Sequence, residues 1–354
     1  MKEFRKNVAI SIDGGGIKGI VATKALSMLE DHLIQTGYIK KRLNEKVHLF
    51  AGTSTGAIIA SALASGVSAN DLNGYYRKLG RDVFKKLFPG YTSLRMVFTG
   101  EYYSNKKLES LLKTILGEKI GEGAKMKYFY SLDPKIDVVF TTFDITSNRT
   151  RFIKPWNVPE KKKDENFTEW PVVKAVLASS AAPTYFPPVK GEYGQYIDGG
   201  VGSYNNPSYI TAYEITHHLN EKRKWTTKNT TLISIGTGRD KPIAESLEDI
   251  RLDPVKFAKA MLGAFMQSAN DQQNDLTKEF LHPLDFRRFQ VDLDEEIELD
   301  DVKMLKKLEE HYGKKMGELI LDYDGKSEAD KDKSKKRDVG KKKRSKGTRK
   351  PRNA

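Results

Sequence analysis

A serine between two glycines is the first feature of this sequence that could do covalent chemistry. Ser54 lies within Gly52-Thr53-Ser54-Thr55-Gly56, after an apolar run at 47–51 and before a run of small residues at 57–64. The two runs predict a strand before the serine and a helix after it, an arrangement that presents a nucleophilic hydroxyl at the top of a sheet. The alternative is an ordinary turn without chemistry, and the strand and helix in register favour the nucleophile.

A glycine-rich loop earlier in the chain could bind an anion. It reads Asp13-Gly14-Gly15-Gly16-Ile17-Lys18-Gly19, between an apolar run at 8–12 and a helical pattern that begins at Ile17. A dinucleotide-binding fingerprint needs an acid about 20 residues later, at the end of a second strand, and a P-loop needs Ser or Thr after its lysine; neither is present. What remains is a set of N–H groups at a helix N-terminus, which in an acyl-transfer enzyme would hold the oxyanion. The alternative is a turn that only lets helix and strand approach.

A serine nucleophile needs a base, and no histidine has a recognisable catalytic setting. The six histidines are His32, His48, His217, His218, His282 and His311. Asp198 is the better candidate, because it follows a short apolar run and is succeeded by Gly199-Gly200, which would let a substrate come near. Taken alone, however, Asp-Gly-Gly is most often a simple turn.

The elements that must position these residues alternate between strand and helix patterns. Residues 8–66 read as strand, loop and helix, twice in succession. Such alternation predicts an α/β fold, with a mainly parallel sheet covered by helices on both faces. Further strands are predicted at 137–145, 150–154, 231–235 and 286–291. Further helices are predicted at 68–79, 106–116, 172–180, 207–219, 254–281 and 302–321.

Composition excludes several classes of site and of protein. The 354 residues include no cysteine, which excludes a disulfide scaffold, a Cys-ligated metal site and a thiol nucleophile. No uninterrupted apolar run approaches the roughly 18–20 residues that cross a bilayer. The apolar stretch before Asp13 is too short for a signal peptide. We therefore expect a cytoplasmic protein.

Taken together, the three motifs resemble the patatin-like phospholipase family. Its members carry D-G-G-G-x-R-G, G-x-S-x-G and D-G-G/A in this order, and the stretches at 178–188 and 205–207 are also similar to family segments. The resemblance extends over about residues 8–240. Lys18 stands where the family usually has arginine; it keeps the positive charge but lacks the planar fork that makes bidentate contacts.

The resemblance implies a three-layer α/β/α sandwich and a lipid acyl hydrolase of phospholipase A or lysophospholipase type. Ser54 would attack an acyl ester of a glycerophospholipid, and Asp198 would accept its proton, without a histidine. The glycine loop, with Gly14, Gly15, Gly16 and Lys18, would form the oxyanion hole. Gly52, Thr53, Thr55 and Gly56 would form the nucleophile elbow. No metal or other cofactor is implied.

Two other functions stay open at this point. One is a signal-regulated effector phospholipase that degrades membranes once a cyclic nucleotide activates it. The other is a non-catalytic lipid-binding protein with the same fold, against which the intact Ser54 and Asp198 argue. The lipid headgroup, the ester position and the oligomeric state do not follow from the sequence.

The positive charge is concentrated at the C-terminal end. Residues 326–354 hold fourteen Lys and Arg against four Asp and Glu, a net charge of +10 out of +14 for the chain. With few apolar residues, this segment is predicted to be a disordered tail. It would follow a patatin-like domain at 1–325, which has core motifs at 8–240 and a variable helical part at 241–325. Three alternatives stay open for what this tail binds. The first is an anionic membrane surface, which would suit a peripheral lipase. The second is nucleic acid, and the third is a solvated tail without a partner.

Overall fold

The computed structural model describes residues 1–83, 103–132, 134–156, 164–240 and 254–325. Every residue predicted to do chemistry lies within these ranges. The predicted tail at 326–354 lies outside them.

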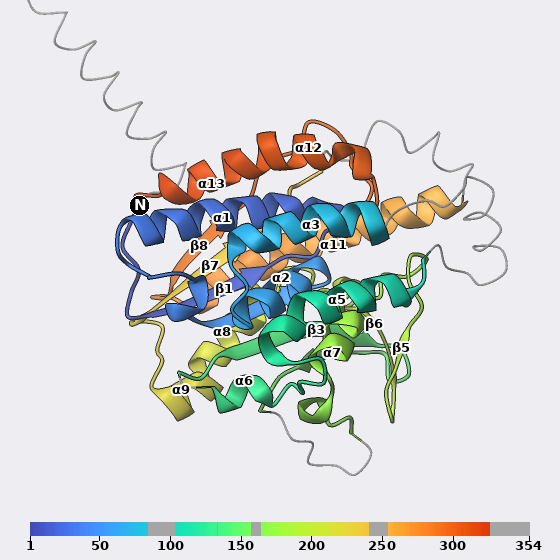
Figure 1. The fold of residues 1–354 in the computed structure, drawn as a ribbon, viewed down its shortest axis with the longest axis horizontal. Coiled ribbons are helices and arrows are strands. Elements are labelled where there is room, and N and C mark those ends of the chain that lie inside the picture. Colours follow the sequence, from blue (N-terminus) through green and yellow to red (C-terminus); the bar gives the residue numbers. More distant parts are fainter. Residues whose placement is uncertain (84–102, 133, 157–163, 241–253, 326–354) are drawn as a thin grey trace, which may run out of the picture.

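The described residues form an eight-stranded sheet with a parallel centre (Figure 1). Its strands are β1 (Asn7–Ile12), β2 (Val47–Thr53), β3 (Asp137–Asp144), β4 (Arg149–Ile153), β5 (Val189–Lys190), β6 (Gln195–Asp198), β7 (Thr230–Ile235) and β8 (Asp285–Phe289). Along the order β3-β2-β1-β7-β8 every pair is parallel. β4 and β6 pair antiparallel with β3, and β5 pairs antiparallel with β6. All residues of β1 except Asn7 are buried, as expected for a central parallel strand.

Helices cover both faces of this sheet. They are α1 (Gly19–Gln35), α2 (Thr55–Ala64), α3 (Ala69–Val83), α5 (Asn105–Ile120), α6 (Tyr128–Ser131), α7 (Val172–Ser179), α8 (Ser208–Thr216), α9 (His218–Arg223), α11 (Pro254–Phe280), α12 (Leu305–Lys307) and α13 (Lys314–Leu321). One core lies between the sheet and α1, α2, α3, α5 and α7, and a second lies against α8 and α9. α11 packs on α8. This arrangement confirms the predicted three-layer α/β/α sandwich.

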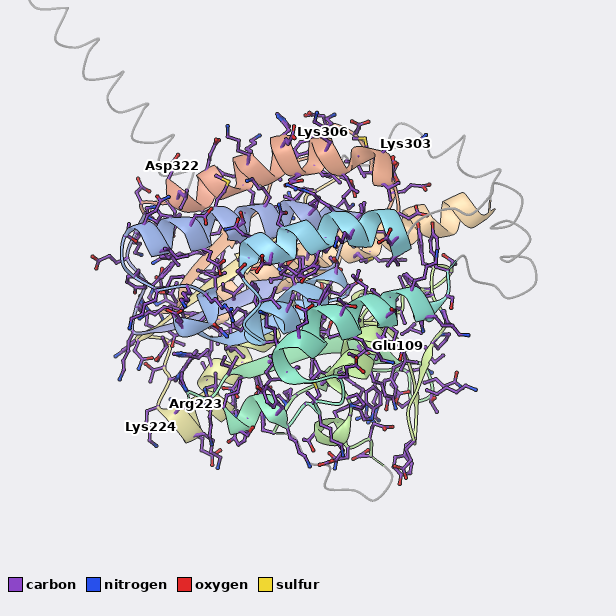
Figure 2. The ribbon with its side chains drawn as sticks, viewed as in Figure 1. Glu109, Arg223, Lys224, Lys303, Lys306 and Asp322 are labelled. Atoms are coloured by element: carbon purple, nitrogen blue, oxygen red, sulfur yellow. The ribbon has the colours of Figure 1, made fainter. Side chains whose placement is uncertain are left out.

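The C-terminal helices add an outer layer over α1. α13 packs against α1, and Figure 1 shows α12 and α13 running along its outer side. The exposed side chains of Lys303, Lys306 and Asp322 lie on the surface of this segment (Figure 2). The helix predicted at 302–321 is interrupted by a wider turn at Leu308–Gly313, which the apolar pattern does not distinguish from a regular helix.

The other differences from the predicted elements concern helix ends and short elements. α3 and α5 continue to Val83 and Ile120, beyond the ends predicted at 79 and 116, so Gly117 lies within α5. β5 has two residues and α6 has four, too few for a periodic pattern to show. The helix predicted at 207–219 ends at Thr216, because His217 leaves the helical conformation with φ −110° and ψ −87°. A separate helix, α9, then begins at His218.

Candidate active site

The chain turns sharply at Ser54, between β2 and α2. Ser54 has φ 56° and ψ −122°, a conformation that costs free energy for any residue with a Cβ. Close backbone contacts require the flanking glycines: a Cβ on Gly52 would lie 2.1 Å from the carbonyl oxygen of Gly56, and a Cβ on Gly56 would lie 2.2 Å from that of Ile12. The predicted strand–turn–helix elbow is therefore present, and Ser54 lies at its turn.

Hydrogen bonds from a neighbouring segment hold the elbow in this shape. The Ser54 N–H donates to Ser179 Oγ at 3.0 Å, and Ser180 Oγ donates to the Ser54 carbonyl at 3.0 Å. Thr53 Oγ1 donates to the Tyr204 carbonyl at 2.6 Å, so this flanking threonine ties β2 to the loop before α8. These contacts join positions more than 100 residues apart, and sequence reasoning did not assign them.

β6 brings Asp198 to Ser54. Asp198 is opposite Thr142 of β3, and β3 is the parallel neighbour of β2, the strand that ends next to Ser54. Ser54 and Asp198 line the same pocket, and Ser54 lies close enough to the Asp198 carboxyl to lower its pKa. The Gly200 N–H donates to Oδ1 of the same carboxylate at 2.8 Å. The structure thus brings together the serine and the aspartate that the sequence suggested.

The environment of Asp198 adjusts its proton affinity. The residue is 4% exposed. Burial raises the pKa of its carboxyl to about 6, while the neighbouring Ser54 side chain and the hydrogen bond from Gly200 act in the opposite direction. A carboxylate with this pKa is ionised at pH 7 yet binds a proton more readily than an exposed aspartate does. That combination suits a general base near neutral pH.

Two glycines of the loop at 13–19 lie beside this pair. Gly15 and Gly16 line the same pocket as Ser54 and Asp198. Gly15 precedes and Gly16 begins a short helical turn that leads into α1, and the first N–H groups of a helix have no acceptor within it. These two amides are therefore suited to hold a negative oxygen.

The other two residues predicted for the oxyanion hole have different partners. The Gly14 N–H donates to the Asn205 carbonyl at 3.0 Å. The Lys18 side chain is almost fully buried and forms an ion pair with Asp240. Neither Gly14 nor Lys18 is among the described residues that line the pocket. In this structure both residues hold the loop in place, and Gly15 and Gly16 face the pocket.

Tyr76 of α3 connects the elbow to the glycine loop. Its hydroxyl donates to the Gly16 carbonyl, which can only accept. Its other hydroxyl contact, with Thr55 Oγ1, therefore has Thr55 as the donor. Burial raises the pKa of the Tyr76 phenol, so it stays protonated and keeps this bond. The amphipathic pattern of α3 gave no sign of this role.

The pocket around Ser54 is mainly apolar. Its hydrophobic lining includes Ile58, Leu108, Pro183, Phe186, Met266 and Leu299. The only ionisable carboxyl among its described lining residues is that of Asp198. A pocket of this composition favours a hydrocarbon chain whose polar end lies at the serine.

Comparison with known proteins gives the family. Residues 10–211, more than half of the chain, match the family described as patatin-like phospholipase. The chain belongs to the patatin-like phospholipase family. The members of this family are lipid ester hydrolases. The matched range includes the glycine loop, the elbow and Asp198, and it ends before β7.

Individual relatives of this patatin-like phospholipase are distant. A "cGAMP-activated phospholipase" of Vibrio cholerae is 29% identical over 58% of this chain and 57% of its own length. A protein of the same name from Escherichia coli is 26% identical over 67% of this chain and 64% of its own. The solved structure of VipD from Legionella pneumophila is 14% identical over 90% of this chain and 67% of its own, with a TM-score of 0.43. The match thus spans less than two thirds of the length of the two curated relatives.

The histidines of this patatin-like phospholipase lie away from the serine. None of the six is among the described residues that line the pocket. His218 stacks on Trp156 with ring centroids 4.2 Å apart, and His217 stacks on Tyr213 at 3.8 Å. Among the described residues there is no group of acids and histidines with the arrangement of a metal site. Likewise, none of the described helices has the length and apolar composition to cross a membrane.

Proposed function

We propose that this patatin-like phospholipase is a lipid acyl hydrolase of phospholipase A or lysophospholipase type that cleaves fatty acyl esters of glycerophospholipids. The observation that carries the proposal is the placement of the strained Ser54 beside the buried Asp198, at an apolar pocket. Serine and aspartate form the catalytic dyad in this proposal, and Asp198 is the base.

The reaction has two halves. In the first, Asp198 takes the Ser54 proton while Ser54 Oγ attacks the ester carbonyl, whose oxygen becomes an oxyanion held by the N–H groups of Gly15 and Gly16. The tetrahedral intermediate then expels the lysolipid alkoxide, which takes the proton from Asp198. In the second half Asp198 takes a proton from water, and the resulting hydroxide attacks the acyl-enzyme. Ser54 leaves with that proton, and the fatty acid is released.

The pocket supports an acyl chain as the group that enters beside Ser54. Ile58, Leu108 and Phe186 present hydrocarbon to whatever lies there. Each buried methylene contributes about 0.8 kcal/mol to binding from the hydrophobic effect. A long acyl chain is thus bound much more strongly than a short one, and we expect long-chain esters to be preferred.

Fatty-acid release from phosphatidylcholine and lysophosphatidylcholine tests the dyad. Ser54→Ala and Asp198→Asn should each reduce the rate by at least 10³-fold, as loss of a nucleophile or its base does in serine hydrolases. Ser61→Ala is the matched control, because Ser61 is a buried serine of α2 whose hydroxyl donates to the Ile58 carbonyl within its own helix. Full activity in either dyad variant would refute the proposal.

A signal-regulated effector is the second candidate function. It is favoured by the names of the two relatives above, both described as cGAMP-activated phospholipases. In that case the purified chain should show low fatty-acid release that rises when cGAMP is added. A non-catalytic lipid-binding protein is the third, and it should not be labelled by a serine-directed fluorophosphonate.

A further inference from the structure

The direction of the Gly15 N–H is set by what holds the carbonyl of Gly14. These two groups belong to one peptide unit, and in a planar trans peptide the C=O and the N–H point in opposite directions. Thr237 Oγ1 donates to the Gly14 carbonyl at 2.8 Å. Asn205 Nδ2 is also directed to this oxygen, at 3.4 Å, a distance at which a hydrogen bond is weak. The Thr237 hydroxyl is thus the main restraint on this peptide from a side chain.

Strand pairing places Thr237 at this position. β7 is the parallel neighbour of β1, and Ile235 pairs with Ile12 at the ends of the two strands (Figure 1). The Asp13 N–H donates to the Ile235 carbonyl at 3.0 Å. The turn Gly236-Thr237-Gly238 therefore begins beside the glycine loop. It lies outside the residues 10–211 that match the family.

Thr237 and Gly15 are in direct contact. A Cβ on Gly15 would lie 2.2 Å from Thr237 Oγ1 and 2.8 Å from Thr237 Cβ. Only glycine at position 15 lets the Thr237 side chain lie so close to the loop backbone. The close packing means that the Gly14–Gly15 peptide has little freedom to rotate while Thr237 stays in place.

The last residue of β8 and the residue after it fix the turn that carries Thr237. The Gly236 N–H donates to the Phe289 carbonyl at 2.9 Å, and the Gly238 N–H donates to Gln290 Oε1 at 2.9 Å. Gly238 has φ 108°, which favours glycine there. Thr237 itself is 3% exposed. Its hydroxyl is therefore held by a rigid support and shielded from competing water.

Different residues fix the next peptide units of the loop. The Gly15 carbonyl accepts from the Lys18 N–H at 3.1 Å, within the loop itself. The Ile17 N–H donates to the Leu299 carbonyl at 2.8 Å. Loss of the Thr237 hydroxyl would consequently loosen the peptide that carries the Gly15 N–H and leave the restraints on the following units in place.

We propose that Thr237 is a positioning residue of the oxyanion hole: its hydroxyl holds the Gly14 carbonyl and so aims the Gly15 N–H at the oxyanion. This inference rests on the proposed function. It also means that the turn after β7 contributes to the active site, although it lies outside the residues that match the family. Because the oxyanion forms only in the transition state, loss of the Thr237 hydroxyl should lower kcat and leave KM almost unchanged.

The test is a set of substitutions at position 237, measured with a soluble long-chain ester and with a fluorophosphonate. Thr237→Val keeps the shape of the side chain and removes its hydroxyl. It should lower kcat and the rate of Ser54 phosphonylation roughly 10-fold or more, with KM changed less than twofold. Loss of one oxyanion-hole donor lowers kcat by about 10²–10³-fold, and a misdirected donor costs up to that much. Thr237→Ser keeps the hydroxyl and should restore most of the rate. Thr237→Ala and Thr237→Ser both lose the methyl group, so their ratio reports the hydroxyl even if the valine variant folds poorly.

Thr277→Val is the matched control. Thr277 is 1% exposed, and its Oγ1 donates to the Gln273 carbonyl at 2.7 Å in α11. It should shift the melting temperature about as much as Thr237→Val and leave kcat unchanged. Equal kcat in Thr237→Ala and Thr237→Ser, or equal losses in Thr237→Val and Thr277→Val, would overturn the inference while the dyad stands. A wild-type chain that neither hydrolyses esters nor reacts with the fluorophosphonate would overturn both the role of Thr237 and the proposed hydrolase function.

Discussion

The proposed base, Asp198, is a single carboxyl group that is almost fully buried. It lies beside Ser54, and its Oδ1 accepts a hydrogen bond from the Gly200 N–H. An imidazole beside a serine performs the same proton transfer in other hydrolases. In the proposed dyad, burial takes the place of the imidazole, because it brings the pKa of an ordinary acid toward neutrality.

The pH dependence of hydrolysis follows from this carboxyl. Burial raises the pKa of Asp198 to about 6, and the protonated acid cannot take the Ser54 proton. The rate should therefore be constant above about pH 7 and fall roughly tenfold per pH unit below pH 6. The measurement is kcat/KM for a soluble ester between pH 4.5 and 9, with the melting temperature recorded at each pH to exclude unfolding. A fall centred near 3.8, the ordinary value for aspartate, would contradict this account.

Elements position these groups through contacts that only glycine permits. α2 approaches β1 so closely that the Gly56 backbone lies against the end of that strand. β2 and α2 in turn meet at Gly52 and Gly56, and this contact forces Ser54 into its strained conformation. The strain at Ser54 is thus stabilised by the packing of two whole elements.

Substitution of two helical glycines by alanine should have opposite effects on stability. Gly56→Ala places a methyl 2.2 Å from the Ile12 carbonyl oxygen and should lower the free energy of unfolding by roughly 3 kcal/mol. Gly74→Ala, in α3, meets nothing within 4 Å and should raise it by about 0.5–1 kcal/mol. Urea unfolding of both variants measures the difference. Similar shifts in the two variants would show that the close contact at Gly56 does not exist.

The helices and strands could be predicted from the sequence, but the contacts between them could not. The two strand–loop–helix units at 8–66 were predictable, because buried strands and amphipathic helices leave periodic patterns. Ser54 and Asp198 were identified by local glycines and by the resemblance to the family. By contrast, the contacts of Lys18 with Asp240 and of Thr237 with Gly14 join positions more than 200 residues apart. A single sequence contains no pattern that reports such contacts.

On the scale of the whole molecule, the C-terminal part of the described chain supports the glycine loop at 13–19. Arg288 of β8 makes a bidentate ion pair with Asp13, the first residue of the glycine loop, at 2.8 and 2.6 Å. Burial raises the pKa of Asp13, and Arg288 opposes this shift. Residues beyond the family match thus hold both ends of the loop, through Arg288 at Asp13 and Asp240 at Lys18.

The segment at 326–354 should strengthen binding to anionic membranes. It carries a net charge of +10, and a basic residue near an anionic lipid surface contributes about 1 kcal/mol. In co-sedimentation with vesicles containing phosphatidylserine, a 1–325 truncation should therefore bind at least tenfold more weakly than the full chain.

A full-length variant with every Lys and Arg of the segment replaced by Gln is the matched control for length, and it should bind like the truncation. The difference should shrink at high salt and be absent with phosphatidylcholine alone, because screening and neutral lipid both remove the attraction. Equal binding of the three chains to anionic vesicles would refute a membrane role for this segment, and selective retention by nucleic acid would assign it to the rival partner.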